Sequence, residues 1–355
     1  MLFVNARFLT QKTTGVQRYA IEMSGRLKKL IPNIRFLAPK EVVHQAAADD
    51  LEIEKVGRFP GYIWEQVELP KYLRKQGRNA VLLNLANLAP VNYNRNIVTI
   101  HDLAPLIYPR WYSRRFSASY RFLLPEIARK AVGIITVSEF SKREIAARFE
   151  IDSDKISVVY NGVSAEFRPG NREEPGNSLG KYILAVSSLD PRKNFEGIIA
   201  AFGTLDIPGL NLVIAGSKDR IFADKKTERL IRNDGRVIFS GFVDNCNLIN
   251  LYRNAVMLVY PSFYEGFGLP PIEAMACGCP CVVSEAASMP EVCGDAALYC
   301  DPHDHKDIAD KLRSLFFDSR LRNDLVARGL NRAGSYSWEK SARQLLAIVE
   351  EKAQL

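Results

Sequence analysis

The chain has 355 residues, of which 47% are hydrophobic and 25% are charged, and it carries a formal net charge of +8. These values are typical of a globular protein with room for two domains, and they argue against a disordered chain. No apolar run approaches the roughly 18 residues that cross a bilayer, so we expect a cytoplasmic protein, or one attached to the inner face of the cytoplasmic membrane. The charge favours anionic partners such as nucleic acid, phosphate ligands or an acidic membrane, without choosing among them.

Strands and helices alternate in the first half of the chain. Residues 2–6 predict a short strand, and the next helix begins near Gly15, where a glycine would let a ligand approach the backbone. An ordinary turn at the start of a helix explains Gly15 equally well. A strand predicted over 96–100 ends at His101 and Asp102, at the edge of the sheet where ligands bind in doubly wound folds. His101 is therefore a candidate for substrate contact, with a structural hydrogen bond as the alternative.

The segment Arg110–Phe122 interleaves aromatic residues with arginines. This composition suits contact with anionic lipid or with a lipid-diphosphate acceptor. An RNA-binding surface would have a similar composition. So would a plain surface helix whose aromatic side chains pack inward while its arginines stay in water.

Two patterns resemble metal sites, and we interpret both as structural. Asp152-Ser-Asp154 matches the Asp-x-Asp pattern of metal-dependent transferases, but it lies between a helix and a strand, where acidic residues form turns. Cys277-Gly-Cys279-Pro-Cys281 lacks the two-residue gap of a zinc knuckle and is typical of a turn that leads into a buried strand. We therefore expect neither a metal nor a cofactor.

A segment rich in proline, glycine and polar residues, 167–180, predicts a linker between two domains. The first domain is expected over 1–166 and the second over 181–335, with a final helix in 336–355. In the second domain strands again alternate with helices, and they are predicted over 182–186, 210–215, 237–239, 255–260, 280–283 and 297–300. This alternation predicts an α/β protein with two doubly wound, parallel-sheet domains of the Rossmann kind.

A basic turn follows the first strand of the second domain. Arg192 and Lys193 are adjacent, and Asn194 can cap the helix that comes next. Two cations at the carboxyl end of a strand can neutralise a diphosphate, whereas a solvated basic turn is the alternative.

Glu265 and Glu273 flank a glycine-rich turn and a helix that Pro270-Pro271 can begin. We place Glu273 in the first turn of that helix. The helix N-terminus offers unpaired N–H groups to a phosphate, and Gly266 and Gly268 let the backbone approach a ligand closely. Because carboxylates accept hydrogen bonds from sugar hydroxyls, the stretch predicts nucleotide-sugar binding. The alternative is that Glu265 is a solvated loop residue and Glu273 a partner of the helix dipole.

The run from Glu265 to Glu273, followed by Ala-Met-Ala-Cys-Gly-Cys-Pro280, resembles the signature of the retaining nucleotide-sugar glycosyltransferases of family 4. The resemblance implies the GT-B architecture, in which two domains face a cleft and the last helix returns to the first domain. It implies that Lys193 and Arg192 bind the diphosphate and that Glu273 binds the ribose. Sugar hydroxyls would contact Glu265 and the amides of Phe267 and Gly268.

The same resemblance assigns further residues to the site. It implies that His101 lies near the transferred sugar and Gly15 in the loop beside the donor. It places the nucleotide base near Phe242 and Val243. The expected catalytic residues are thus Lys193, Arg192, Glu265 and His101, and the expected donor-binding residues are Gly15, Phe242, Val243, Gly266, Phe267, Gly268, Leu269 and Glu273.

The activity implied by the resemblance is metal-independent transfer of a hexose, with retention, to a glycan or a lipid-diphosphate-linked glycan. The chain is similar to bacterial O-antigen and polysaccharide mannosyl- and rhamnosyltransferases, so GDP-mannose is the first choice of donor. A nucleotide-sugar epimerase of the same architecture is an alternative. A glycoside hydrolase also uses two carboxylates, but hydrolysis expels no diphosphate for the basic turn to bind. A nucleic-acid-binding protein is supported only by charge, and we expect no nucleic-acid partner.

Overall fold

The computed structural model describes residues 1–170, 179–187, 190–216 and 234–353. The chain divides into two compact units: unit 1 comprises Met1–Gly162 and Ser337–Leu355, and unit 2 comprises Val163–Tyr336. The chain leaves unit 1 at Gly162, before the predicted boundary at 166. Gly162 packs so closely on the backbone of Trp338 that a side chain there would overlap it. Part of the predicted linker, 171–178, lies outside the described residues.

Unit 1 is built on a sheet of seven parallel strands in the order β3-β2-β1-β4-β5-β6-β7. Most of these strands are short apolar runs that are buried on both faces, as expected for a parallel sheet covered by helices. The strands are β1 Leu2–Asn5, β2 Arg35–Ala38, β3 Glu54–Lys55, β4 Val81–Asn84, β5 Asn96–Thr99, β6 Gly133–Thr136 and β7 Ile156–Val158.

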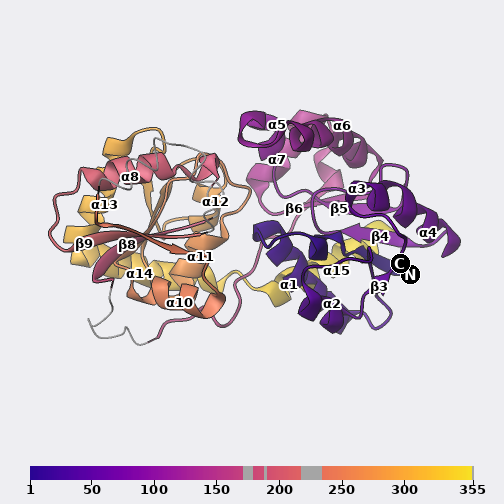
Figure 1. Ribbon diagram of the computed structural model, residues 1–355, viewed down its shortest axis with the longest axis horizontal. Coiled ribbons are helices and arrows are strands. Elements are labelled where there is room, and N and C mark those ends of the chain that lie inside the picture. The colour runs from indigo at the N-terminus through magenta and orange to yellow at the C-terminus, as the bar shows by residue number, and fades with distance from the viewer. Residues whose placement is uncertain (171–178, 188–189, 217–233, 354–355) are drawn as a thin grey trace. The chain divides into compact units, whose positions relative to one another are not determined.

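Helices cover both faces of this sheet, with α6 and α7 on one face and α1 and α15 on the other (Figure 1). The α-helices of unit 1 are α1 Gly15–Leu30, α2 Gln45–Leu51, α3 Gly61–Ile63, α4 Leu69–Lys75, α5 Ala104–Ile107, α6 Arg114–Lys130, α7 Glu139–Phe149 and α15 Trp338–Ala353. Shorter turns are η1 Arg7–Thr10, η3 Pro109–Trp111 and η4 Ser153–Lys155, and a π-helical turn, η2 Trp64–Glu68, joins α3 to α4.

Helix α15 belongs to unit 1 although unit 2 precedes it in the chain. Trp338 is buried with its ring 6.0 Å from that of Tyr19, which belongs to α1. Glu339 accepts a hydrogen bond from Arg26 Nε at 2.8 Å, again across the contact with α1. Ser341 Oγ donates to the carbonyl of Tyr160 at 2.6 Å, just beyond β7. The contacts of α15 therefore complete the side of the sheet that α1 covers.

Unit 2 repeats this architecture with six parallel strands in the order β10-β9-β8-β11-β12-β13. The strands are β8 Lys181–Val186, β9 Leu210–Ala215, β10 Val237–Gly241, β11 Met257–Tyr260, β12 Cys281–Ser284 and β13 Leu298–Cys300. The helices are α8 Phe195–Gly203, α10 Asn245–Asn254, α11 Leu269–Ala276, α12 Met289–Cys293, α13 His305–Phe317 and α14 Ser319–Gly334, and a short turn, η5 Pro191–Lys193, precedes α8.

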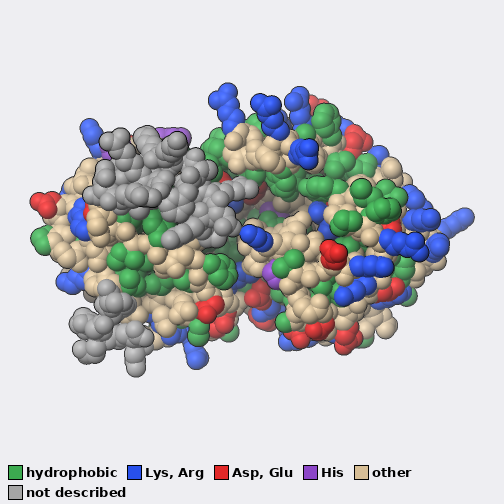
Figure 2. Space-filling view, viewed as in Figure 1, with side chains coloured by type: hydrophobic (Ala, Val, Ile, Leu, Met, Phe, Trp, Pro, Cys, Tyr) green, Lys and Arg blue, Asp and Glu red, His purple; other side chains and the backbone are tan. Residues whose placement is uncertain are grey.

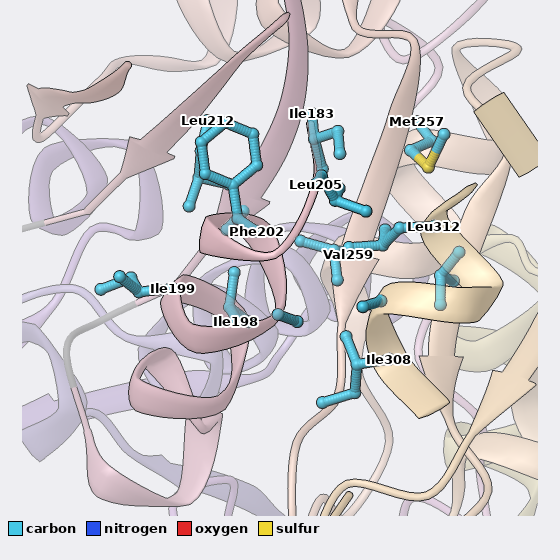
Figure 3. Close-up of a cluster of buried hydrophobic side chains, with 14 of the residues drawn as sticks. Ile183, Ile198, Ile199, Phe202, Leu205, Leu212, Met257, Val259, Ile308 and Leu312 are labelled. Carbon is cyan, nitrogen blue, oxygen red and sulfur yellow. The ribbon is translucent and has the colours of Figure 1, made fainter. Parts of the chain in front are cut away.

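The core of unit 2 lies between the sheet and the helices α8 and α13 (Figure 3). Phe202 of α8 and Leu312 of α13 pack against strand residues that include Ile183 and Val259. All four side chains are at most 1% exposed. Because such packing buries complete apolar side chains, it fixes where β8 and β11 end.

The prediction of two doubly wound, parallel-sheet domains is confirmed. In each unit the first strand lies inside the sheet, the second and third strands are added on one side of it, and the later strands are added on the other side. The direction of the strand order therefore changes between β1 and β4 in unit 1 and between β8 and β11 in unit 2. Open sheets of this kind bind ligands outside the carboxyl ends of the strands at such a switch point. Among the described helices, none is long and apolar enough to cross a membrane.

Candidate active site

The switch point of unit 2 brings the basic turn and the first glutamate of the motif together. Lys193 follows β8, and Glu265 follows β11. These two strands are neighbours and run parallel, so their carboxyl ends meet at one edge of the sheet. Residues 72 positions apart in the sequence are thus in contact.

The turn that carries the two cations is fixed by its own hydrogen bonds. Asp190 accepts a hydrogen bond from the backbone of Arg192 at 3.1 Å, and the carbonyl of Arg192 accepts one from Phe263 at 2.8 Å. Asn194 adopts a left-handed conformation with φ +57° and caps α8 by accepting from the backbone of Gly197 at 3.1 Å. Its amide nitrogen donates to the carbonyl of Pro302 at 2.6 Å. The predicted cap is confirmed, and it also anchors the turn to two other loops.

Lys193, Tyr260 and Glu265 form a closed, buried cluster. Lys193 Nζ donates to the Tyr260 hydroxyl at 2.6 Å and also to Glu265 Oε1. The Tyr260 hydroxyl in turn donates to Glu265 Oε1 at 3.0 Å. Arg192 Nη1 lies 3.6 Å from Glu265 Oε2, and its side chain is 20% exposed, whereas that of Lys193 is 8% exposed. Two cations therefore face one carboxylate, and Arg192 is the more accessible of them.

Burial shifts the protonation equilibria of this cluster. It lowers the pKa of Lys193 to about 8, although the Glu265 carboxylate opposes the change. Burial alone would raise the pKa of Glu265, but the charges of Lys193 and Arg192 outweigh it and hold that pKa below its ordinary value. The pKa of Tyr260 is raised by burial and by Glu265. At neutral pH the cluster thus holds a charged lysine, a carboxylate and a neutral phenol.

The loop after Glu265 is held in place by the residue that caps α12. Ser288 Oγ donates to the carbonyls of Glu265 and Phe267 at 2.9 and 3.2 Å. Gly268 has φ +90°, a conformation that side chains rarely adopt, and a Cβ there would overlap the terminal methyl group of Met289. Gly266, Phe267 and Leu269 are buried beside it. The backbone conformation therefore favours a glycine at 268, and any side chain there would also have to displace the end of the Met289 side chain.

Glu273 lies one turn deeper in its helix than we predicted. Helix α11 begins at Leu269 after the cap residue Gly268, so that Pro270 and Pro271 occupy its first turn and Glu273 is its fifth residue. The first turn contains no acidic residue. The Glu273 side chain is 3% exposed and accepts a hydrogen bond from the Tyr252 hydroxyl at 3.3 Å. The glutamate pair therefore does not flank the helix N-terminus symmetrically.

The remaining predicted site residues come from other segments of the chain. Phe242 and Val243 follow β10, at the same edge of the sheet, and Phe242 is 76% exposed. His101 and Gly15 belong to unit 1. His101 is buried, its Nε2 is 3.0 Å from the carbonyl of Leu85, its ring meets that of Tyr19 edge to face, and burial lowers its pKa. Gly15 is the first residue of α1, where an added Cβ would have open space.

Neither pattern that resembled a metal site forms a cluster of ligands. Asp152 accepts a hydrogen bond from the backbone of Asp154 at 3.0 Å and so caps η4. Cys281 begins β12 and is buried, as predicted for a turn leading into a strand. Within residues 1–170, 179–187, 190–216 and 234–353, no group of three or more His, Cys, Asp or Glu side chains is placed to hold a metal ion.

Sequence reasoning missed Tyr260, which contributes a hydroxyl to the centre of the cluster. It reads as the last apolar residue of a buried strand. Its position immediately before the motif loop was the available signal, because the last residue of a parallel strand borders the ligand-binding edge of the sheet.

Comparison with known proteins gives consistent results for both halves of the chain. Residues 13–167 match the family model "Glycosyltransferase Family 4", and residues 168–332 match "Glycosyl transferases group 1". The chain is 29% identical to O-antigen chain mannosyltransferase B of Escherichia coli, over 94% of this chain and 95% of that protein. It is 28% identical to O-antigen chain mannosyltransferase RfbU of Salmonella typhimurium, over 95% and 96% of the two chains.

A solved structure supports the same fold. Anabaena Alr3699/HepE in complex with UDP and glucose matches with a TM-score of 0.79 over 99% of each chain, at 16% identity. At this identity the match establishes the architecture of two parallel-sheet domains, known as GT-B, and nothing about the ligand of the present chain.

Proposed function

Because this chain belongs to the family 4 glycosyltransferases, we propose that it transfers mannose from GDP-mannose to a glycan, or to a lipid-linked glycan, in the synthesis of a cell-surface polysaccharide. The observation that carries the site is the contact of Lys193 and Arg192 with Glu265 at the β8/β11 switch point. The choice of mannose and of polysaccharide follows the names of the two O-antigen mannosyltransferases, which the chain matches along almost its whole length.

The proposed reaction is retaining and uses neither metal nor cofactor. The bond between the sugar C1 and the phosphate oxygen breaks, and the acceptor oxygen forms its bond to C1 on the same face. The acceptor's proton passes to an oxygen of the departing diphosphate. As negative charge grows on that diphosphate, Lys193 and Arg192 stabilise it, and preorganised charges in a buried site do so more effectively than water. Glu265 and the backbone of residues 266–268 hold the sugar hydroxyls.

We expect GDP-mannose to stabilise the protein against heat. At a concentration one hundred times its Kd, a ligand that binds only the folded state adds about 2.7 kcal/mol to the free energy of unfolding. The melting temperature should then rise by several degrees. Differential scanning fluorimetry with a series of nucleotide-sugars, and with free mannose as the control, measures this.

If another nucleotide-sugar stabilises the protein instead, the proposed donor is wrong but the proposed reaction stands. No stabilisation by any of them would contradict the proposal. An epimerase would convert the sugar of the donor without releasing GDP, so release of GDP that depends on a glycan acceptor separates the two activities.

We also propose that α6 attaches the enzyme to anionic lipid. Arg114 and Arg121 are seven residues apart, as are Arg115 and Phe122, so all four occupy one side of the helix. The three arginines are exposed, and Phe122 is 71% exposed. Figure 2 shows Lys and Arg side chains projecting from this edge of unit 1, where Figure 1 places α6. Other aromatics of the segment pack on one another, as Tyr112 does on Phe116, and so contribute less.

Charge reversal on α6 should release the protein from vesicles. Each arginine near an anionic surface contributes about 1 kcal/mol, so Arg114→Glu with Arg115→Glu should reduce binding by more than tenfold. Co-sedimentation with phosphatidylglycerol vesicles measures the change, and Arg313→Glu with Arg320→Glu, in unit 2, is the matched control. Binding that is equal for both double variants would contradict the attachment of α6.

A further inference from the structure

A second polar site lies at the switch point of unit 1, where β1 and β4 end. The segments that follow these strands line a pocket together with the π-helical turn η2. Its lining combines polar side chains, among them Arg7, Gln11 and Glu65, with apolar side chains such as Phe8 and Leu85. None of these residues belongs to the predicted site. The pocket occupies the position in unit 1 that the lysine and glutamate cluster occupies in unit 2.

Glu65 is the unusual member of this pocket. It is 1% exposed, and its Oε1 accepts hydrogen bonds from Asn5 Nδ2 at 2.8 Å and Arg7 Nε at 2.9 Å. Its Oε2 is also buried, and no described residue donates a hydrogen bond to it. An unsatisfied oxygen on a buried carboxylate destabilises the fold, so it requires an explanation in terms of a water or a ligand.

The backbone fixes Glu65 in this position. In η2 the N–H of Leu69 bonds to the carbonyl of Trp64, five residues back, which inserts an extra residue into the helix that runs from α3 to α4. Such turns are rare, and they occur frequently at functional sites. Trp64 is fully buried, and its indole N–H donates to the carbonyl of Val56 at 2.7 Å. The buried Trp64 therefore anchors the turn that carries Glu65.

The partners of Glu65 are held in place as well. Asn5 Nδ2 also donates to Asn84 Oδ1 at 3.0 Å, and Asn84 Nδ2 donates to Asn96 Oδ1 at 3.2 Å. This chain of carboxamides crosses β1, β4 and β5. The guanidinium of Arg7 lies over the ring of Tyr62, 4.9 Å from its centre. The hydrogen-bonding groups around the pocket are thus ordered before any ligand arrives.

The chemistry of the pocket fits one hydroxyl group of a sugar and the carbon that carries it. A carboxylate oxygen can accept a hydrogen bond from a sugar hydroxyl, and a guanidinium can donate one to the hydroxyl oxygen. The apolar side chains of the lining can pack against the adjoining C–H groups. The enclosed part has room for about one water-sized group, which suits a hydroxyl rather than a complete ring. We propose that this pocket binds a hydroxyl group of the glycan acceptor, with Glu65 Oε2 as its hydrogen-bond acceptor. The proposal rests on the glycosyl transfer proposed above and names residues that select the acceptor.

Glu65→Gln tests this, because it keeps the shape of the side chain and removes the charge of the carboxylate. The probes are octyl α-mannoside and its four monodeoxy analogues, used with the nucleotide-sugar that gives the largest thermal shift. We expect Glu65→Gln to raise the KM for octyl α-mannoside about tenfold, with the Kd for the donor unchanged. One deoxy analogue should show the same increase in KM with the wild-type protein. Its KM should rise no further with Glu65→Gln, since the missing hydroxyl and the substitution remove the same interaction.

Glu68→Gln is the matched control, because Glu68 lies on the same turn and its carboxylate accepts from the backbone of Arg58 and Phe59 at 2.9 Å, away from the pocket. It should leave the KM for the mannoside unchanged. A Glu65→Gln variant with a lower melting temperature and an unchanged KM would show a purely structural role and overturn the proposal. So would wild-type protein that binds donor but transfers to none of the mannosides. Absence of donor binding in the wild type would instead contradict the proposed function.

Discussion

Replacing Lys193 by alanine should lower kcat by about 10²- to 10³-fold, the loss typical of removing one group that stabilises a developing anion. Lys193 makes the closest contact with Glu265 and is almost fully buried, so no other cation can take its place. Arg192, at 3.6 Å, remains beside the carboxylate and limits the loss of stability. Steady-state rates of GDP release measure the effect. Lys306→Ala, an exposed position on α13, is the control and should be neutral.

The pH profile distinguishes the charge of Lys193 from its packing. Because burial lowers the pKa of Lys193 to about 8, the free enzyme loses this charge as the pH rises through that value, and kcat/KM should fall there. Lys193→Arg keeps the positive charge to higher pH, so its kcat/KM should show no such fall. Unchanged turnover in a folded Lys193→Ala protein would show that Lys193 has no catalytic role.

Replacing Gly268 by alanine should lower the free energy of unfolding by about 1–3 kcal/mol and reduce turnover with it. An alanine at 268 must adopt φ +90°, and its Cβ must displace the side chain of Met289. Met289 begins the helix beside the loop. Since Glu265 is only three residues away from Gly268, a shifted loop also separates it from Lys193. Urea denaturation measures the loss of stability, and donor titration measures the effect on the site.

Gly203→Ala is the control for that substitution. Gly203 ends α8, and an added Cβ there meets nothing within 4 Å. Alanine should therefore be neutral or stabilising at this position, because it restricts the unfolded chain. Equal effects of the two substitutions would contradict the steric and conformational argument for Gly268.

The fold could be predicted from the sequence because most strands are short apolar runs. The predicted strand 210–215 coincides with β9, and 182–186 differs from β8 by one residue. The division of the chain was harder to predict, because it depends on contacts between residues far apart in the sequence, among them that of Gly162 with Trp338. Local composition placed the boundary in the Pro- and Gly-rich segment instead.

The site could be predicted where its residues lie in local motifs. Lys193 and Glu265 stand in separate motifs whose strands proved to be neighbours. Glu273 was misplaced because α11 begins at Leu269, before the two prolines that were predicted to begin it. Glu65 had no local signal, since its partners Asn5 and Arg7 are 60 and 58 residues away.

The position of α15 determines the order in which the two units can be completed during translation. A ribosome synthesises every residue of unit 2 before it reaches Ser337, where the last helix of unit 1 starts. Until then α1 lacks the contact between the rings of Tyr19 and Trp338. The half of the protein that is synthesised first therefore cannot be completed until the last residues of the chain have been synthesised.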